Sequence, residues 1–458
     1  MCNNPKIKLT GDIVMPPPGG QKEEYDSARQ VFNTCFDKYP DVVVFAKNTQ
    51  DVVNAVRYSL SENTPIRVRS GGNSYEGLST LDHGEGIVID VSKINDIKID
   101  FESKTVKVGA GCKNADLTRV LGENGLAVPN GICPTPAISG IALGGGQGVL
   151  SRSLGLLLDH VIEIEMVDAN GRVLTVNEQQ HPDLFWALRG GGGSFGICTS
   201  FRFHTQEIKT VGFAEVCWEF QDLKDVLQEW QKYTLPNSDE RFTPILTLSS
   251  EKDQPVLMHG VFKGAVTELE KLIQPLLKIG SPKVIIKELP FLEAITLIAK
   301  YQPTDPFSFK SVAPYIEEIL PEAGLDVIQR FMSEAEVPSN CAVSVFFQGL
   351  GGAVSKKKEN ETAYPHRKTL ANIALFAAWN KTGKSEEGIR WIEDFRNALT
   401  PFTKGVYVNA PDCSIQNWSY AYYGDNFKRL TQIKTKYDPG NIFEFPQSIP
   451  LANPSENM

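Results

Sequence analysis

The chain has 458 residues, 41% hydrophobic and 22% charged, which is typical of a soluble globular protein with two or three domains. Its formal net charge of −9, with no long Lys/Arg cluster, argues against nucleic-acid binding. No apolar run approaches the ~20 residues of a membrane-spanning helix. Because the N-terminus has no apolar signal core, we expect a cytoplasmic protein.

The first part of the chain alternates strand-like and helix-like segments. We expect an irregular N-terminal arm at 1–35 and a first domain at 36–208. The expected helices are 25–39, 49–60, 115–123 and 183–188, and the expected strands are 42–45, 65–69, 87–90, 105–108, 161–167, 172–176 and 197–203. Asn170-Gly171 predicts a hairpin between two of these strands.

From residue 209 to about 400 the pattern changes to a second domain. Strands are expected at 213–220, 244–248, 256–262, 284–289, 341–347 and 373–379, and helices at 223–233, 266–277, 292–299, 312–319 and 386–399. This order predicts an antiparallel sheet with helices on one face. The tail, 401–458, should carry a strand at 406–408 and a helix at 426–436.

Three glycine-rich loops mark the first domain. Residues 69–77 and 131–148 can bring backbone N–H groups close to an anion, and Arg69 adds a cation to the first loop. Residues 191–196 match G-x-G-x-x-G, but a helix precedes them and a strand follows, so the dinucleotide fingerprint fails. Any one loop could be a plain turn; together they favour a phosphate-bearing cofactor.

Eight cysteines and six histidines are dispersed without a CxxC pair. We therefore expect no structural metal site, and reduced thiols rather than a disulfide framework.

Four stretches carry a family resemblance: PIRVRSGGNSYEG (65–77), GICPTPAISGIALGGGQG (131–148), HPDLFWALRGGGGSFG (181–196), and YYGDNFKRL with KYDPGNIFEFPQSIP (422–450). They resemble the berberine bridge enzyme-like FAD-linked oxidases, which are vanillyl-alcohol oxidase (PCMH-type) flavoproteins. The resemblance implies an α+β protein: a two-lobed FAD-binding domain to which the tail returns, and an inserted substrate domain at 209–400.

The resemblance also implies which residues hold FAD. The pyrophosphate should lie on the first loop, the second loop should line the other side, and the third should contact the adenosine or the ring edge. The expected residues are Arg69, Ser70, Gly71, Gly72, Asn73, Ser74, Cys133, Ser139, Gly140, Gly144, Gly145, Gly148, Gly196, Ile197 and Asn409.

In many members a histidine bonds the flavin 8α-methyl group and a cysteine bonds C6. Cys133 matches the cysteine, whereas Asn73 stands at the histidine position. An amide nitrogen is not a nucleophile, so Asn73 should make only hydrogen bonds. We expect FAD linked through Cys133 alone, with a polar loop lowering the pKa of its thiol; non-covalent FAD is the alternative.

Related sugar and alcohol oxidases read Tyr-x-Asn-Tyr-x-Asp in the tail, with the later tyrosine as the base. This chain has Ala410 there, so we select Tyr407 and Tyr423 as candidate bases. Tyr420, Asp412 and His366 are further candidates, although we read the tyrosines more readily as core packing and His366 as a surface-loop residue.

The expected activity is oxidation of a C–OH or C–N bond of a small molecule (a sugar, an alcohol or a secondary metabolite) by hydride transfer to flavin N5. Dioxygen is a candidate electron acceptor, although the resemblance implies that Pro136 lies near the flavin face that dioxygen would approach. The alternative is a catalytically weak or silent flavin-binding protein, natural or engineered.

Overall fold

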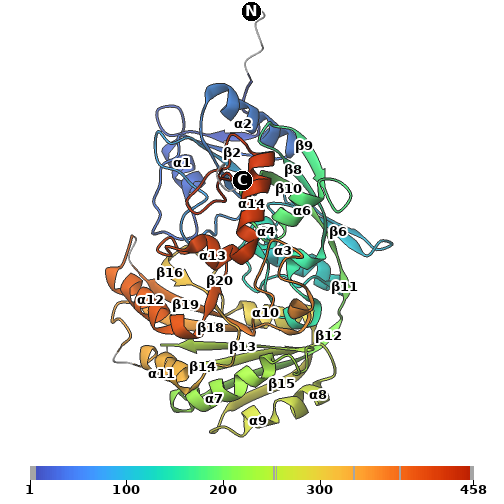
Figure 1. The fold of residues 1–458 in the computed structure, drawn as a ribbon, viewed down its shortest axis with the longest axis vertical. Helices are drawn as coiled ribbons and strands as arrows, with labels where there is room; N and C mark the ends of the chain where they lie inside the picture. Colours follow the sequence, from blue (N-terminus) through green and yellow to red (C-terminus); the bar gives the residue numbers. More distant parts are fainter. Residues whose placement is uncertain (1–6, 251–252, 254, 334–335, 381–382, 454–458) are drawn as a thin grey trace, which may run out of the picture.

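The computed structural model describes residues 7–250, 253, 255–333, 336–380 and 383–453 (Figure 1). Its first sheet has the order β1-β2-β4-β3, comprising β1 (Asp12–Val14), β2 (Val42–Phe45), β4 (Ile87–Asp90) and β3 (Ile66–Arg69). β2 and β3 run parallel to β4, and β1 pairs antiparallel with β2. Part of the expected N-terminal arm therefore belongs to this sheet.

The second sheet has the order β5-β6-β10-β8-β9 and is antiparallel throughout. Its strands are β5 (Ile97–Asp100), β6 (Thr105–Gly109), β10 (Ile197–His204), β8 (Val161–Val167) and β9 (Val173–Val176). β8 and β9 form the hairpin predicted at Asn170-Gly171. Helix α2 (Thr49–Glu62) contacts both β4 and β8, so it joins the two sheets.

Shorter elements complete this lobe. They are α1 (Lys22–Arg29), α3 (Asn114–Glu123), α4 (Ile138–Gly144), α5 (Ser151–Leu154), α6 (Pro182–Leu188), and the paired strands β7 (Leu126–Ala127) and β11 (Gln206–Glu207).

The third sheet has nine strands and forms the second lobe (Figure 1). They are β12 (Thr210–Trp218), β13 (Phe242–Ser249), β14 (Val256–Phe262), β15 (Lys283–Pro290), β16 (Ser308–Val312), β17 (Pro314–Ile316), β18 (Ala342–Gly349), β19 (Ala371–Trp379) and β20 (Lys404–Val406). Every recorded pairing is antiparallel.

Helices cover the outer face of this sheet, with apolar stripes turned inward. They include α7 (Leu223–Trp230), α8 (Val266–Leu272), α9 (Gln274–Leu277), α11 (Glu322–Phe331) and α12 (Glu386–Leu399), while α10 (Phe291–Ala299) packs between β12 and α3. The predicted α+β fold, with an antiparallel sheet covered by helices, is thereby confirmed.

Two expectations fail in this lobe. Residues 312–319, expected as a helix, contribute to β16 and β17, because their short apolar run is buried within the sheet and periodicity cannot separate such a run from a helix. The strand expected at 406–408 ends at Val406 and pairs with β17, so the large sheet extends into the segment assigned to the tail.

The tail then returns to the first lobe through α13 (Trp418–Tyr423) and α14 (Phe427–Tyr437) (Figure 1). Lys434, fully buried, donates to the Ser194 and Phe443 carbonyls at 2.8 and 3.0 Å and to Asp438 at 2.7 Å. This lysine fixes the tail against the third glycine loop.

Among the described residues, no helix combines the length and apolar character needed to cross a bilayer.

Candidate active site

A cavity of about 1020 Å³ lies between the two lobes. One wall, here called the glycine-loop half, comes from residues 70–75, 131–141 and 192–196. The facing wall, the sheet half, comes from β13, β16, β18 and β19, and the segment 407–411 lies between them. At the upper end of the volumes typical of small-molecule sites, this space suits a large cofactor together with a substrate.

The first glycine loop presents its backbone to the cavity. Residues 70–75 all line it, and in the described part of the chain the N–H groups of 71–75 donate to no acceptor. Arg69, by contrast, is 4% exposed, pairs with the buried Asp90 and donates to the Ala28 carbonyl at 2.6 Å. We therefore remove Arg69 from the proposed pyrophosphate cradle, because its charge is already neutralised inside the lobe.

The second and third loops leave space where side chains would intrude. Gly140 and Gly193 both line the cavity, and a Cβ at either position would meet no protein atom within 4 Å. Ser139, Gly192 and Gly196 line it beside them. Open N–H groups and side-chain-free backbone fit a nucleotide cofactor that carries a pyrophosphate.

Besides Arg69, four of the expected cofactor contacts do not line the cavity. A Cβ on Gly144 would overlap Asn409, one on Gly145 would meet Tyr407 and Tyr364, and one on Gly148 would overlap the Asn130 carbonyl. Ile197 is fully buried at the start of β10. These residues permit close packing behind the wall, which a glycine-rich sequence alone does not distinguish from ligand contact.

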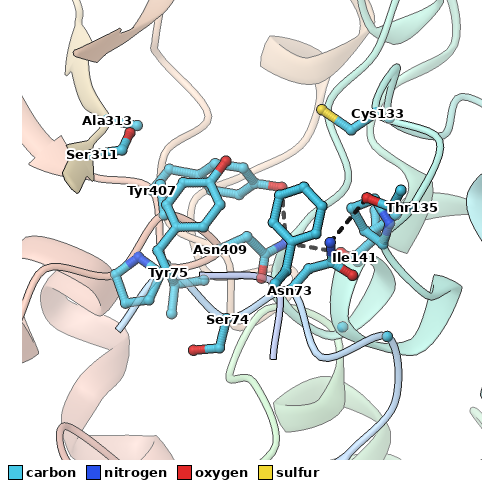
Figure 2. Close-up of a pocket in the computed structure, with 18 of the residues that line it drawn as sticks. Asn73, Ser74, Tyr75, Cys133, Thr135, Ile141, Ser311, Ala313, Tyr407 and Asn409 are labelled. Atoms are coloured by element: carbon cyan, nitrogen blue, oxygen red, sulfur yellow. Dashed lines mark hydrogen bonds between the residues drawn. The ribbon is translucent and has the colours of Figure 1, made fainter. Parts of the chain in front are cut away.

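Asn73 is held by protein groups on both sides. One atom of its amide lies 2.9 Å from Thr135 Oγ1, the contact dashed in Figure 2, and the other lies 2.8 Å from the Gly71 carbonyl. In the orientation that satisfies both contacts, the nitrogen donates to Gly71 and the oxygen accepts from Thr135. The neighbours fix this orientation, since two carbonyls surround one amide atom. Asn73 thus ties the first loop to the second by hydrogen bonds, the role that its amide chemistry allows.

The Cys133 side chain points into the cavity from the opposite loop (Figure 2). Its Sγ lies 3.3 Å from Gln302 Oε1, which comes from the loop after α10. Burial raises the pKa of the Cys133 thiol to about 11, so the predicted lowering by a polar loop does not occur. Among the described residues, no nearby positive charge opposes this effect of burial.

Tyr407 follows β20 and places its phenol where two donors converge. The oxygen accepts from Gly146 N and from Asn409 Nδ2, each at 2.9 Å, and Asn409 also donates to the Ile141 carbonyl at 3.1 Å. Burial raises the pKa of Tyr407 to about 12, although the bonds from Gly146 and Asn409 oppose this rise. The same bonds would hold a phenolate if it formed.

The other proposed bases are placed differently. Tyr423 lines the cavity beside Gly192 and packs on Tyr422 and Phe427, away from the groups around Tyr407. Tyr420 is 61% exposed, and Asp412 is fully buried in ion pairs with Lys310 and Arg396.

His366 is not a surface-loop residue. It is buried against Tyr315, with ring centroids 4.5 Å apart, and burial lowers its pKa to about 4.

Several residues that line the cavity were not predicted from the sequence. The Tyr75 phenol has no hydrogen-bond partner in the described chain, and the buried Ser311 hydroxyl is likewise unpartnered. Gln147 donates to Tyr315 Oη at 2.9 Å. Tyr75 and Gln147 lie inside the glycine-rich motifs, so their position was a usable signal. Ser311 had none, because it lies outside every motif and directly before residues 312–319, which were expected to be a helix.

Comparison with known families is consistent with this geometry. Residues 40–177 match the family described as "FAD binding domain", and residues 406–450 match "Berberine and berberine like". The chain is 37% identical over 451 residues, 97% of its length and 98% of the relative's, to an uncharacterized FAD-linked oxidoreductase, YgaK, of Bacillus subtilis (strain 168).

Two solved structures are similar over almost the whole chain. BBE-like 1 of Physcomitrella patens aligns with a TM-score of 0.89 and 28% identity, covering 97% of this chain and 98% of that one. Berberine bridge enzyme from Eschscholzia californica aligns with a TM-score of 0.86 and 26% identity, covering 96% and 97%.

Proposed function

The chain belongs to the berberine bridge enzyme-like FAD-linked oxidoreductases and uses FAD, and from this premise we propose that it oxidises a C–OH bond of a small molecule in the cavity between its lobes. The alternative is that the bond oxidised in the substrate is a C–N bond. The observation that carries the proposal is the pair of N–H donors, Gly146 and Asn409, on the Tyr407 oxygen.

FAD, when bound, takes up a hydride equivalent from a substrate C–H bond. The task left to the protein is to remove the hydroxyl proton, and we assign it to Tyr407. Its oxygen can receive that proton only as a phenolate, which the Gly146 and Asn409 donors stabilise. Ala410, buried and lining the cavity, offers no alternative base.

The glycine-loop half is proposed to hold FAD through backbone N–H groups and the side chains of Ser70, Ser74 and Ser139. Cys133 is the proposed single covalent attachment, because its thiol points into the cavity while the Asn73 amide is committed to Thr135 and Gly71. The raised pKa of the thiol makes this bond slow to form.

Intact-mass spectrometry of denatured protein tests the attachment: the expected mass is that of the chain plus FAD, and the bare chain mass would rule the link out. Anaerobic mixing of the holoenzyme with neutral alcohols, sugars and amines tests the activity by bleaching of the flavin absorbance.

The runner-up, a silent flavin-binding protein, is favoured by one observation: at neutral pH the raised pKa keeps Tyr407 protonated. Firm FAD binding with no bleaching by any compound class would support it.

The electron acceptor needs a separate test. Reoxidation of the reduced flavin in air-saturated buffer tests whether dioxygen reaches it, given that Pro136 lines the cavity.

A further inference from the structure

The sheet half of the cavity is built from alternate residues of adjacent strands. On β19 these are Asn372, Ala374, Phe376 and Ala378, and the neighbouring strands add Phe309, Ser311, Ser344, Phe346 and Gln348. Register places Ser311 and Ser344 on either side of Phe376. Directly opposed residues share a face, so this row looks onto the cavity together.

Phenylalanine rings form a continuous part of this wall. The Phe309 and Phe376 rings are stacked, with centroids 4.9 Å apart and planes 21° apart, and Phe307 lies 4.9 Å from Phe309. Tyr75 meets Phe309 edge-on at 5.0 Å from the facing loop. Ala374 and Ala378 flank Phe376 on the same face, so shallow recesses adjoin the central ring.

The larger polar side chains in this part of the cavity already make hydrogen bonds within the protein. Asn372 donates to the Ala313 carbonyl at 3.1 Å, and Gln348 donates to the Gly148 carbonyl at 3.2 Å. Gln147 donates to Tyr315 in the same way. The described lining residues of β13, β16, β18 and β19 carry no charge, and Asp253, in the loop between β13 and β14, adds a carboxylate to the same cavity.

One buried polar group on this wall remains open. Ser311 is 1% exposed, its hydroxyl has no partner among the described residues, and it lines the cavity next to Phe376. Figure 2 shows Ser311 on the side of the cavity across from Cys133, with Tyr75 and Tyr407 between them in this view. A buried hydroxyl without a partner is costly, and a substrate group that reaches it removes that cost.

We propose that the substrate is a neutral aromatic alcohol, whose ring packs along the Phe309–Phe376 wall and whose polar group bonds to Ser311. This substrate class rests on the oxidation proposed above. A ring gains edge-to-face or offset contacts with phenylalanine that a saturated ring lacks. An anionic substrate would find no cation on these strands and would meet the carboxylate of Asp253. An oligosaccharide would bury several hydroxyls, for which the already bonded amides offer few partners.

The test compares four compounds on the holoenzyme under anaerobic conditions: p-methoxybenzyl alcohol, cyclohexylmethanol, p-(hydroxymethyl)benzoate and cellobiose. Flavin bleaching is expected to be fastest with the first, at least tenfold slower with the anion, and undetectable with cellobiose. Bleaching by cellobiose but not by the aromatic alcohol overturns the substrate class and leaves the oxidase function standing. Bleaching by none of them overturns both.

Binding gives a readout independent of turnover. The non-oxidisable p-methoxytoluene should perturb the flavin spectrum on titration. Phe376→Leu keeps an apolar side chain but removes the ring, and should raise the apparent Kd about 2- to 10-fold. The matched control is Phe331→Leu, which removes a ring stacked on Phe395 at 4.5 Å in the outer helix layer and should leave that Kd unchanged. Equal Kd values in wild type and Phe376→Leu would overturn the proposed wall.

Discussion

Backbone forms the recognition surface of the glycine-loop half, whereas side chains form that of the sheet half. In the first, N–H groups of residues 71–75 and the bare positions Gly140 and Gly193 face the cavity. In the second, a row of rings, hydroxyls and methyl groups alternates along the strands. The first arrangement suits a cofactor shared by a whole family; the second can change one residue at a time, and so can set the substrate.

Tyr407 lies where the two halves meet, and its removal should have the largest effect. Tyr407→Phe should lower the rate of anaerobic flavin reduction by about 10²- to 10⁴-fold, the usual worth of a positioned acid or base. FAD content should stay at the wild-type level, because the phenol contacts Gly146 and Asn409 rather than the open loop. Stopped-flow absorbance measures both quantities.

Two comparison variants sharpen this prediction. Tyr420→Phe alters an exposed tyrosine and should be silent. If Tyr423→Phe slowed reduction more than Tyr407→Phe, the base would belong beside Gly192 instead.

The pH dependence follows from the same phenol. The active form is the phenolate, and burial raises the pKa of Tyr407 to about 12. The reduction rate should therefore rise with pH, about tenfold per unit, throughout the range below that pKa. Tyr407→Phe should lose this slope. A flat wild-type profile from pH 7 to 10 would exclude a titrating phenol from the rate-determining step.

An ion cluster joins the halves outside the cavity. Lys310 of β16 pairs with Glu76 of the first loop and, at 2.7 Å, with Asp412 of the tail, which also binds Arg396 at 2.5 Å. Asp412→Asn leaves Arg396 without its buried carboxylate and Lys310 with Glu76 alone, and should cost about 3–5 kcal/mol of unfolding free energy. The exposed pair Lys224–Asp326 gives the control, and Asp326→Asn should cost at most about 1 kcal/mol.

The stabilisation by Asp412 depends on pH. Burial alone would raise the pKa of Asp412, but Lys310 and Ser414 outweigh it and hold the pKa below the ordinary 3.8. The stabilisation by Asp412 is therefore complete above that value and is lost as the pH falls through the lowered pKa. Denaturant unfolding at several pH values measures it; a deficit in Asp412→Asn that grows toward low pH would contradict the assignment.

The two halves also differ in how far sequence could predict them. The glycine loops, the cofactor and the role of Asn73 could be predicted, because a loop that presents its backbone to a ligand is rich in glycine. Arg69 was not, because a cation beside a glycine loop has the same sequence whether it faces the ligand or a buried Asp90. Gly144 and Gly148 likewise look like cradle glycines yet serve packing.

In the sheet half, the elements but not their faces could be predicted. Which side of β19 looks inward depends on cross-strand register, which is tertiary information. The pattern at 312–319 predicts a helix, which leaves Ser311 outside any expected strand, although it lies in β16. The aromatic wall therefore appears only when distant strands are brought together.

A larger side chain at position 140 tests whether the glycine-loop half holds FAD. A leucine there would meet no protein atom within 4 Å at its Cβ, so it projects into the proposed FAD space. Gly140→Leu should weaken FAD binding at least about tenfold while the apoprotein gains about 0.5–1 kcal/mol of helix stability. Fluorescence titration with FAD and thermal unfolding of apoprotein separate the two effects. Unchanged FAD affinity would remove the second loop from the cradle.

The smallest expected effect tests the sheet half with a pair of buried hydroxyls. Ser311 and Thr243 are both 1% exposed and unpartnered in the described chain, but only Ser311 lines the cavity. Because an unpartnered buried hydroxyl is costly, Ser311→Ala and Thr243→Val should each raise the unfolding free energy by about 1 kcal/mol. Only Ser311→Ala should also raise KM for the aromatic alcohol, by about 5-fold. A gain in stability without a loss in KM would show that Ser311 is a tolerated defect of packing, and the wall would then recognise its substrate through the rings alone.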